Sequence, residues 1–175
     1  MLRRIQRLLR HRWQDASTLR RALPPAALDR LTQRVRASEQ RHSGEIRVFI
    51  EAGLPTSYLW RREALPGIIR QRALSQFGKL RVWDTEHNNG VLIYLLLAER
   101  AIEIVADRGI DRHLSHQDWQ AMIGRMRAAF LLGRFEDGLT QALEEISAVL
   151  VQHFPLAAGD ANPNELPDAP VIGKT

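Results

Sequence analysis

The feature that most constrains the fold is a run of eight apolar residues from Val91 to Ala98. The run has the length of a strand, and it is apolar throughout, as is typical of a strand that is covered on both faces. It is too short to cross a membrane as a helix, which takes about 20 apolar residues. We therefore predict a central strand over residues 90–98, in a sheet with helices on both sides.

Two further segments predict neighbours for this strand. Residues 45–51 alternate along the chain as a strand does, and residues 101–106 follow the central strand closely enough to form a hairpin with it. Residues 61–80 have helical character with an interruption at Pro66-Gly67. A helical crossover makes strands 45–51 and 90–98 parallel, with a right-handed connection. The predicted fold class is α/β, a three-layer α/β/α sandwich around a small mixed β-sheet.

More helices are expected around this core. Pro24-Pro25 suits the start of a helix over residues 26–41, and a loop is expected before it. Ser115, with Asp118 three residues later, predicts the start of a helix that Gly133 ends. A last helix is expected from Phe135 to His153, followed by a proline-rich tail that is extended or disordered. The predicted division is an N-terminal helix and linker (1–24), a domain (25–155) and a tail (156–175).

The composition excludes several classes of protein. The absence of cysteine excludes disulfides and thiol catalysis. No phosphate-binding glycine loop, zinc-protease motif or serine-hydrolase motif occurs in the sequence. Because residues 1–13 contain no apolar run of signal-peptide length, we expect a cytoplasmic protein.

The basic charge lies mainly in the N-terminal part. The net charge is +5, yet residues 1–47 hold twelve arginines against four acidic residues. Residues 1–13 read as a basic amphipathic helix, which could lie on an anionic membrane surface. The favoured interpretation is that its apolar stripe packs on the domain while the arginines face water. Nucleic acid is not expected, because no set of aromatic side chains for stacking accompanies the arginines.

Oxygen-bearing side chains precede and follow the predicted hairpin. Asp84, Glu86 and Asn88 alternate like the first ligands of a calcium-binding EF-hand loop. Asn89 and Leu95 stand where that loop needs glycine and glutamate, so an EF-hand is excluded. A plain polar loop before the strand explains the same residues without any ligand.

The hairpin would bring a second acidic cluster to the same corner. If its turn centres on Glu99-Arg100, Asp111 lies opposite Asn88 and Gly109 lies opposite Gly90. Hard oxygen ligands without cysteine favour Ca²⁺ or Mg²⁺ over zinc. The predicted metal ligands are Asp84, Glu86, Asn88, Asp107 and Asp111.

Two observations oppose this metal site. Arg108 and Arg112 could balance the carboxylates without any ion. The corner also lies at the amino ends of the parallel strands, whereas ligands of open α/β sheets usually bind at the carboxyl ends.

The histidines and one further acid are weaker candidates. His87 lies in the polar loop and could act as an acid or base. His113 and His116 have a spacing that would allow metal binding, but they are expected at the surface beside the helix cap. Asp137 is a candidate to support the metal ligands from the next helix.

Several blocks, in order and spacing, resemble the TPM-domain family. They are Ser43-Gly44-Glu45-Ile46, the segment from Trp83 to Leu92, Asp107-Arg108-Gly109-Ile110, Trp119 and Phe135-Glu136-Asp137-Gly138-Leu139. The tail Asn164-Glu165-Leu166-Pro167 is similar to that of bacterial cytoplasmic members. The resemblance implies an α/β/α sandwich and, from other members, binding of divalent cations such as calcium. A plant member of the thylakoid lumen is associated with acid phosphatase activity and photosystem II repair.

The leading prediction is a cytoplasmic TPM-domain protein with a site for Ca²⁺ or Mg²⁺. It would act as a binding or interaction module for a protein partner that the sequence does not identify, in a role linked to membrane-protein maintenance. The rival prediction is a metal-assisted acid phosphatase, in which the cation polarises a phosphomonoester and activates water. The sequence identifies no catalytic residue, so whether the protein is an enzyme stays open.

Overall fold

The computed structural model describes residues 9–13, 16–157, 159–160 and 162–173. Its helices are α2 (Ala16–Ala22), α3 (Pro25–Glu39), α4 (Thr56–Leu59), α5 (Leu65–Lys79), α6 (Arg108–Asp111), α7 (His116–Leu131) and α8 (Phe135–His153). Its strands are β1 (Glu45–Glu51), β2 (Gly90–Leu96), β3 (Ala101–Ala106) and β4 (Val171–Ile172).

The four strands form one mixed sheet in the order β3-β2-β1-β4. β1 and β2 are parallel, and Glu45 lies opposite Gly90. β3 returns antiparallel to β2, and β4 runs parallel to β1 on its other side. The sequence-based prediction of two parallel strands and an antiparallel hairpin partner is confirmed.

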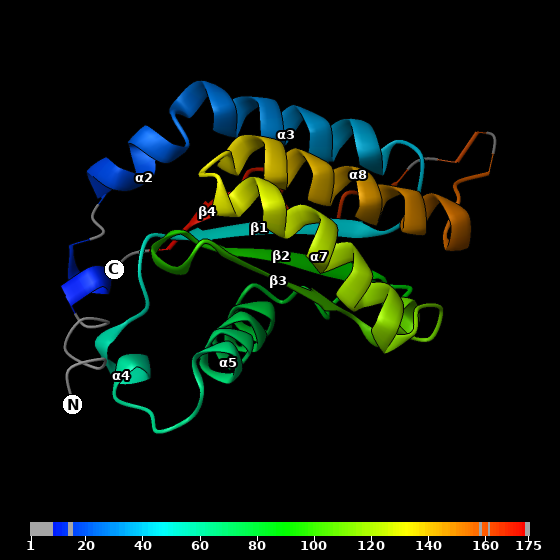
Figure 1. Cartoon of the computed structure of the whole chain (residues 1–175). Coiled ribbons are helices and arrows are strands. Elements are labelled where there is room, and N and C mark those ends of the chain that lie inside the picture. Colours follow the sequence, from blue (N-terminus) through cyan, green and yellow to red (C-terminus); the bar gives the residue numbers. More distant parts are fainter. Residues whose placement is uncertain (1–8, 14–15, 158, 161, 174–175) are drawn as a thin grey trace.

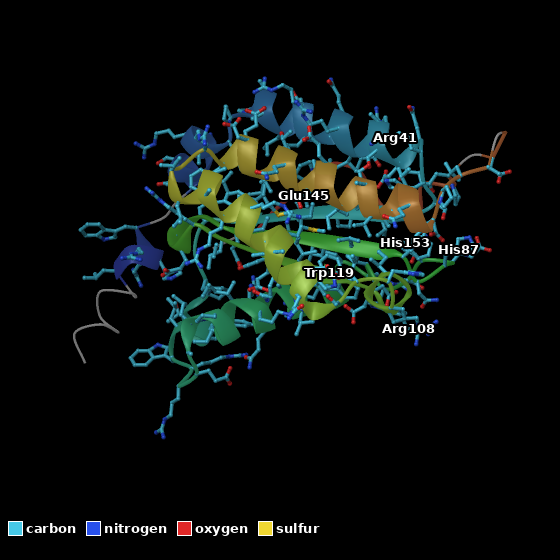
Figure 2. The ribbon with its side chains drawn as sticks, turned by 45° about the vertical axis from the view of Figure 1, so that its right-hand side comes forward. Arg41, His87, Arg108, Trp119, Glu145 and His153 are labelled. Atoms are coloured by element: carbon cyan, nitrogen blue, oxygen red, sulfur yellow. The ribbon has the colours of Figure 1, made fainter. Side chains whose placement is uncertain are left out.

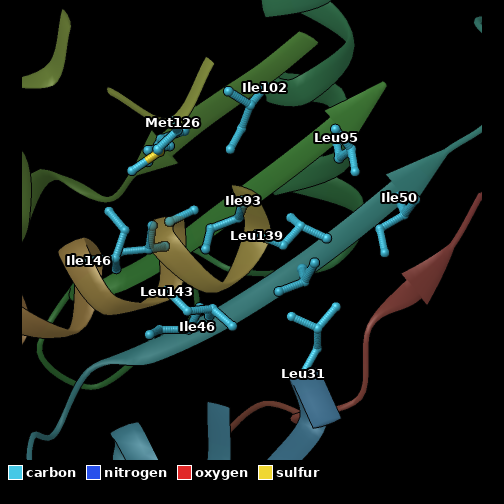
Figure 3. Close-up of a cluster of buried hydrophobic side chains, with 14 of the residues drawn as sticks. Leu31, Ile46, Ile50, Ile93, Leu95, Ile102, Met126, Leu139, Leu143 and Ile146 are labelled. Carbon is cyan, nitrogen blue, oxygen red and sulfur yellow. The ribbon is translucent and has the colours of Figure 1, made fainter. Parts of the chain in front are cut away.

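Helices cover both faces of the sheet, which confirms the predicted α/β/α sandwich. Figure 1 shows α3, α7 and α8 over one face and α5 under the other. Side chains from the first face of β1, β2 and β3 pack against these three helices in one hydrophobic cluster (Figure 3). The second face packs against α5 in another cluster. All seven residues of β2 are buried, as the unbroken apolar run predicts for a strand covered on both sides.

Three helical segments differ from the prediction. The expected loop before residue 25 contains α2, whose Leu19 is buried against the first cluster. Pro66-Gly67 does not interrupt α5, because both residues lie in its first turn, where proline leaves no hydrogen bond unmade. The strand β2 ends at Leu96, and residues Leu97–Glu99 form a 3₁₀ turn.

The register of the hairpin also differs from the prediction. Val91 pairs with Ala106, so the strands are shifted by two residues from the expected pairing. The cause is the turn, in which Arg100 takes a left-handed conformation with φ of 49°. Asp111 therefore does not lie opposite Asn88, and the backbone N–H of Asp107 donates to the carbonyl of Gly90 at 2.9 Å.

The described part of the tail packs on the domain. Val171 and Ile172 pair with β1, a strand that the sequence did not predict. Leu166 and Asp168 are buried on the way to it. The tail thereby covers the edge of β1 that would otherwise be open.

The predicted N-terminal helix lies partly outside the described residues, because these begin at Leu9. Residues 9–12 are helical, and the buried ring of His11 attaches them to the domain. Its Nδ1 accepts from the backbone N–H of Leu54 at 3.0 Å, and its Nε2 lies 2.9 Å from the Glu99 carboxylate. Of the predicted apolar stripe, the described residues Leu9 and Trp13 are 48% and 78% exposed, and its other residues lie outside the described part of the chain. None of the described helices combines the length and apolar character that crossing a membrane requires.

Candidate functional site

The corner predicted from the sequence is held together by close backbone contacts. The N–H of Gly109, in α6, donates to the carbonyl of Asn88 at 2.9 Å. A Cβ at position 109 would lie 2.4 Å from that carbonyl oxygen and 2.8 Å from the carbonyl oxygen of His87. Only glycine allows this approach, so the loop before β2 and the segment after β3 meet without a gap.

Arg108 occupies one of the predicted metal ligands. Asn88 has a left-handed backbone, with φ of 53°. Its side-chain oxygen accepts from Nε and Nη2 of Arg108 at 3.0 and 2.9 Å. Because the amide of Asn88 is neutral, this contact occupies a predicted ligand without balancing the charge of the neighbouring carboxylates.

The other predicted acids of the loop point to different partners. Asp84 forms an ion pair with Arg81 at 2.8 Å. The side chain of Glu86 is exposed, and its backbone N–H donates to the Glu165 carboxylate at 3.1 Å. Asp111 is exposed at the end of α6.

Two buried oxygens at this corner have no hydrogen-bond donor among the described residues. Asp107 is the N-cap of α6, and its Oδ1 accepts from the N–H of Arg108 at 2.7 Å, while its Oδ2 is buried and unpaired. Asn89 is fully buried, and its Nδ2 donates to Oγ of Ser43 at 3.2 Å, while its Oδ1 is unpaired. Buried acceptors of this kind are uncommon and call for a ligand, an ion or a water.

The corner therefore suits a cation only in part. Within the described ranges, no three His, Asp or Glu side chains come close enough together to hold a metal ion. Asn88 and Asp107 are brought together through Arg108, whereas Asp84 and Glu86 lie among other partners. The complete set of five ligands stays a prediction.

The histidines and Asp137 occupy separate places. Figure 2 shows His87, Arg108 and His153 toward one end of the molecule. His113 stacks on the ring of His153 with centroids 4.2 Å apart, which gives it a packing role. Asp137 lies in the first turn of α8, while the residue after its other end, Phe154, accepts a hydrogen bond from Ser43 beside the corner. A 19-residue helix is roughly 28 Å long, so Asp137 does not support the predicted ligands.

Comparison with known proteins gives the family. The family model of the TPM domain matches residues 18–149, which is most of the chain. The chain belongs to the TPM-domain family. Its structure is similar to the NMR structure of the BA42 protein from the psychrophilic bacterium Bizionia argentinensis, with 28% identity, a TM-score of 0.70 and coverage of 86% of this chain and 95% of that one. No curated protein gives a significant match.

Three of the blocks that carry the TPM resemblance, those that contain Ser43, the loop before β2 and Asp107, converge on the corner. Ser43 binds Asn89 from the start of β1, and the segment Asp107–Ile110 closes against the loop before β2. The prediction that these three segments meet at the amino ends of β1 and β2 is confirmed by the pairing of Glu45 with Gly90.

A buried polar cluster that was not predicted from the sequence lies next to this corner. It lies between the end of α3, the start of β1 and the tail that follows α8. The carboxylate of Glu45 accepts from the N–H of Leu166 at 3.0 Å, and Nη1 of Arg47 donates to the carbonyl of Ala169 at 3.2 Å. Nε of Arg36 donates to Asp168 at 3.0 Å.

Burial shifts the protonation of this cluster. Burial, with the charges of Glu45 and Asp168 nearby, raises the pKa of Glu39 to about 8, although the N–H of Ile46 donates to its carboxyl group. Burial lowers the pKa of His42 to about 4. Its Nδ1 lies 3.0 Å from the carbonyl of Gly44, so Nδ1 carries the proton and Nε2 accepts from Ser38.

One signal in the sequence could have found part of this cluster. Strand alternation puts Glu45 and Arg47 on the same face of β1, opposite the apolar Ile46 and Val48. Their hydrogen-bond partners, the backbone groups of Leu166 and Ala169, lie 121 and 122 positions further along the chain, so the pairing itself had no local signal.

Proposed function

We propose that this TPM-domain protein is a binding module whose corner at the amino ends of β1 and β2 takes Ca²⁺ or Mg²⁺. The observation that carries the proposal is the buried, unpaired Oδ2 of Asp107. The unpaired Oδ1 of Asn89 adds a second hard oxygen. Asn89 precedes Gly90, whose carbonyl accepts a hydrogen bond from the backbone N–H of Asp107. Carboxylate and amide oxygens are the ligands that these two cations prefer.

Asp84, Glu86, Asn88 and Asp111 complete the proposed set through side-chain rotation or through water. Each is on the loop or on α6, so none requires the sheet to move. Because Arg108 already binds the amide oxygen of Asn88, the cation competes with a guanidinium group. We therefore expect weak binding, with a dissociation constant on the order of 10⁻⁴ to 10⁻³ M.

The test is a thermal melt of chelator-treated protein titrated with Ca²⁺, Mg²⁺ and Zn²⁺. A hundredfold excess over the dissociation constant adds about 2.7 kcal/mol, which raises the midpoint by roughly 5–11 °C for a chain of this size. Asp107→Asn should remove the rise, because the amide oxygen still caps α6 but lacks the charge. Asp118→Asn is the matched control, since Asp118 belongs to the capping box of α7, away from the corner. A midpoint that no cation moves contradicts the proposal.

Hydrolysis of phosphomonoesters, the second function predicted from the sequence, depends on the same ion. Bound at the corner, the cation would polarise phosphate and activate water. Turnover of p-nitrophenyl phosphate that survives purification and is lost in Asp107→Asn would support the enzyme. Cation binding without turnover assigns the binding module alone.

The proposed setting is the cytoplasm, with a role in membrane-protein maintenance. Support for contact with an anionic membrane comes from Leu9 and Trp13, which are exposed beside Arg10 and Arg12. Co-sedimentation with phosphatidylserine vesicles, compared between the full chain and Trp13→Ala, tests this contact. Binding that falls steeply with salt supports it, and equal sedimentation of the two proteins contradicts it.

A further inference from the structure

The strand β3 is an open edge of the sheet. It pairs only with β2, and no strand among the described residues covers its other side. Asp107 is hydrogen-bonded to Gly90 across the hairpin, and such pairs alternate along antiparallel strands. The backbone groups of Ile102, Ile104 and Ala106 therefore point away from β2. The hydrogen bond that the carbonyl of Ile104 accepts from Arg70 of α5, at 2.5 Å, agrees with this direction.

A groove runs along this edge between α5 and α7. Two adjoining cavities of about 630 and 410 Å³ form it, and both are lined by residues of α5, β3 and α7. Figure 1 shows α5 and α7 on opposite faces of the sheet, with β3 as the strand at this edge. Leu74 and Phe77 form part of the α5 wall, and Trp119 and Ile123 form part of the α7 wall. Trp119 is labelled on α7 in Figure 2.

The two ends of the groove carry opposite charge. Arg100 and Arg127 line the end beside Ala101 together with Glu99, whose carboxylate is paired with Arg10. Both lining arginines are exposed and form no ion pair in the part of the chain that the structure describes. Asp111 lines the end beside Ala106. The charge of Glu103, between these ends, is balanced by Arg70. A ligand that is acidic at one end and basic at the other would match this pattern.

We propose that the groove binds an extended peptide segment of a partner protein, which adds to the sheet antiparallel to β3. Its backbone would pair with Ile102, Ile104 and Ala106, displacing the Arg70 guanidinium from the Ile104 carbonyl. Alternate apolar side chains would pack on the α5 and α7 walls. In this direction the carboxyl end of the peptide meets Arg100 and Arg127, so that end is acidic, and the amino end beside Asp111 is basic.

The walls of the groove favour a single strand over a second copy of the chain. If β3 of a second copy paired with this edge, the α5 and α7 of that copy would come with it. They would collide with the α5 and α7 that already form the walls of the groove. A peptide brings no flanking helices. The site differs from the cation corner except for Asp111, so peptide binding is expected to persist in chelator, and its failure would leave the cation proposal untouched.

The test uses a fluorescein-labelled peptide of about ten residues in which valine and threonine alternate, enough to span β3. In the test peptide two lysines precede this segment and two glutamates follow it. In the control peptide the glutamates come first and the lysines last. Fluorescence anisotropy in chelator should show binding at least about tenfold tighter for the first peptide. The double variant Arg100→Glu and Arg127→Glu should reverse that preference. Methylation of alternate backbone nitrogens of the peptide should abolish binding if the contact is backbone pairing.

A substitution in the groove wall, compared with one outside it, distinguishes binding in the groove from nonspecific binding of the peptide. Leu74→Glu introduces a charge at a side chain that is 47% exposed, so the fold should persist while peptide binding falls at least about tenfold. Leu132→Glu, at a residue that is 70% exposed and does not line the groove, is the matched control. Amide hydrogen exchange gives a direct readout, since the N–H groups of Ile102, Ile104 and Ala106 should slow on adding peptide.

Three results would overturn the proposal. The first is that the charge-exchanged control peptide, or the N-methylated peptide, binds as tightly as the test peptide. The second is binding without slower exchange at the three outward amides. The third is a concentration-dependent dimer that Leu74→Glu abolishes, which would assign the groove to a second copy.

Discussion

The ion pair between Glu51 and Arg72 offers the sharpest prediction about stability. Glu51, at the end of β1, is fully buried, and Arg72 of α5 reaches it with Nη2–Oε1 and Nε–Oε2 distances of 2.5 and 3.0 Å. The hydroxyl of Tyr94, on β2, donates to the same carboxylate at 2.8 Å. The burial of this site and the charge of Glu51 raise the pKa of Tyr94, so the phenol keeps its proton. These contacts fasten α5 to the middle of the sheet.

Arg72→Met should destabilise the protein strongly. The substitution keeps the apolar stem of the side chain but removes the guanidinium group. Of the donors described above, only the Tyr94 hydroxyl then remains for the Glu51 carboxylate. Breaking a buried pair from one side costs about 3–5 kcal/mol, because the remaining charge stays buried without its partner. For a chain of this length that corresponds to a fall of roughly 6–20 °C in the melting midpoint.

Urea denaturation at constant pH measures the effect, and a double variant tests its cause. Adding Glu51→Gln to Arg72→Met removes the stranded charge and should restore roughly 1–3 kcal/mol. Arg125→Met is the control, because it breaks an exposed pair with Glu145 and should leave the free energy of unfolding unchanged within error. A loss under about 1 kcal/mol for Arg72→Met, or no recovery in the double variant, would refute the assigned role of the pair.

Four further predictions concern the buried polar cluster, the corner and a helix cap. Between about pH 4.5 and 8 the folded state holds a proton on Glu39 that the unfolded state has released, so the contribution of Glu39 to stability falls as pH rises through this range. Urea denaturation above pH 6.5, where His42 is neutral in both states, should show this fall, and Glu39→Gln should flatten it. Below pH 6.5 the unfolded state protonates His42 while the folded state does not until about pH 4, so this group lowers stability in acid, and His42→Gln should lessen that loss in acid denaturation. Gly109→Ala should lower the free energy of unfolding by about 1–3 kcal/mol in urea, because its methyl group meets the Asn88 carbonyl. Ser115→Ala should cost about 1 kcal/mol in the same assay through loss of the α7 cap.

Segments whose pattern reflects their own surroundings could be predicted from the sequence. The bounds of β1 and β3 are as expected, and the burial of β2 follows from its unbroken apolar run. The capping box of Ser115 and Asp118 formed as expected, because both partners lie within one helical turn. These signals are local, and the structure had no competing contact to override them.

Features that depend on distant partners could not be predicted. The left-handed conformation of Arg100 set the hairpin register. This conformation is uncommon in residues other than glycine, so an arginine in the sequence does not predict it. The strand β4 exists because β1 offers it an edge, and its own two residues carry no pattern. At the corner, the position of the loop followed from the sequence. Which oxygens stay unpaired did not, because that depends on Arg81 and Arg108.

The most direct test of the account is a Ca²⁺ titration of chelator-treated, ¹⁵N-labelled protein followed by NMR. The account predicts saturable shifts of backbone amides in residues 85–90 and 107–111, with smaller changes elsewhere, and their loss in Asp107→Asn. Shifts that never saturate, or that follow exposed acidic residues over the whole surface, would contradict a cation site at the amino ends of β1 and β2.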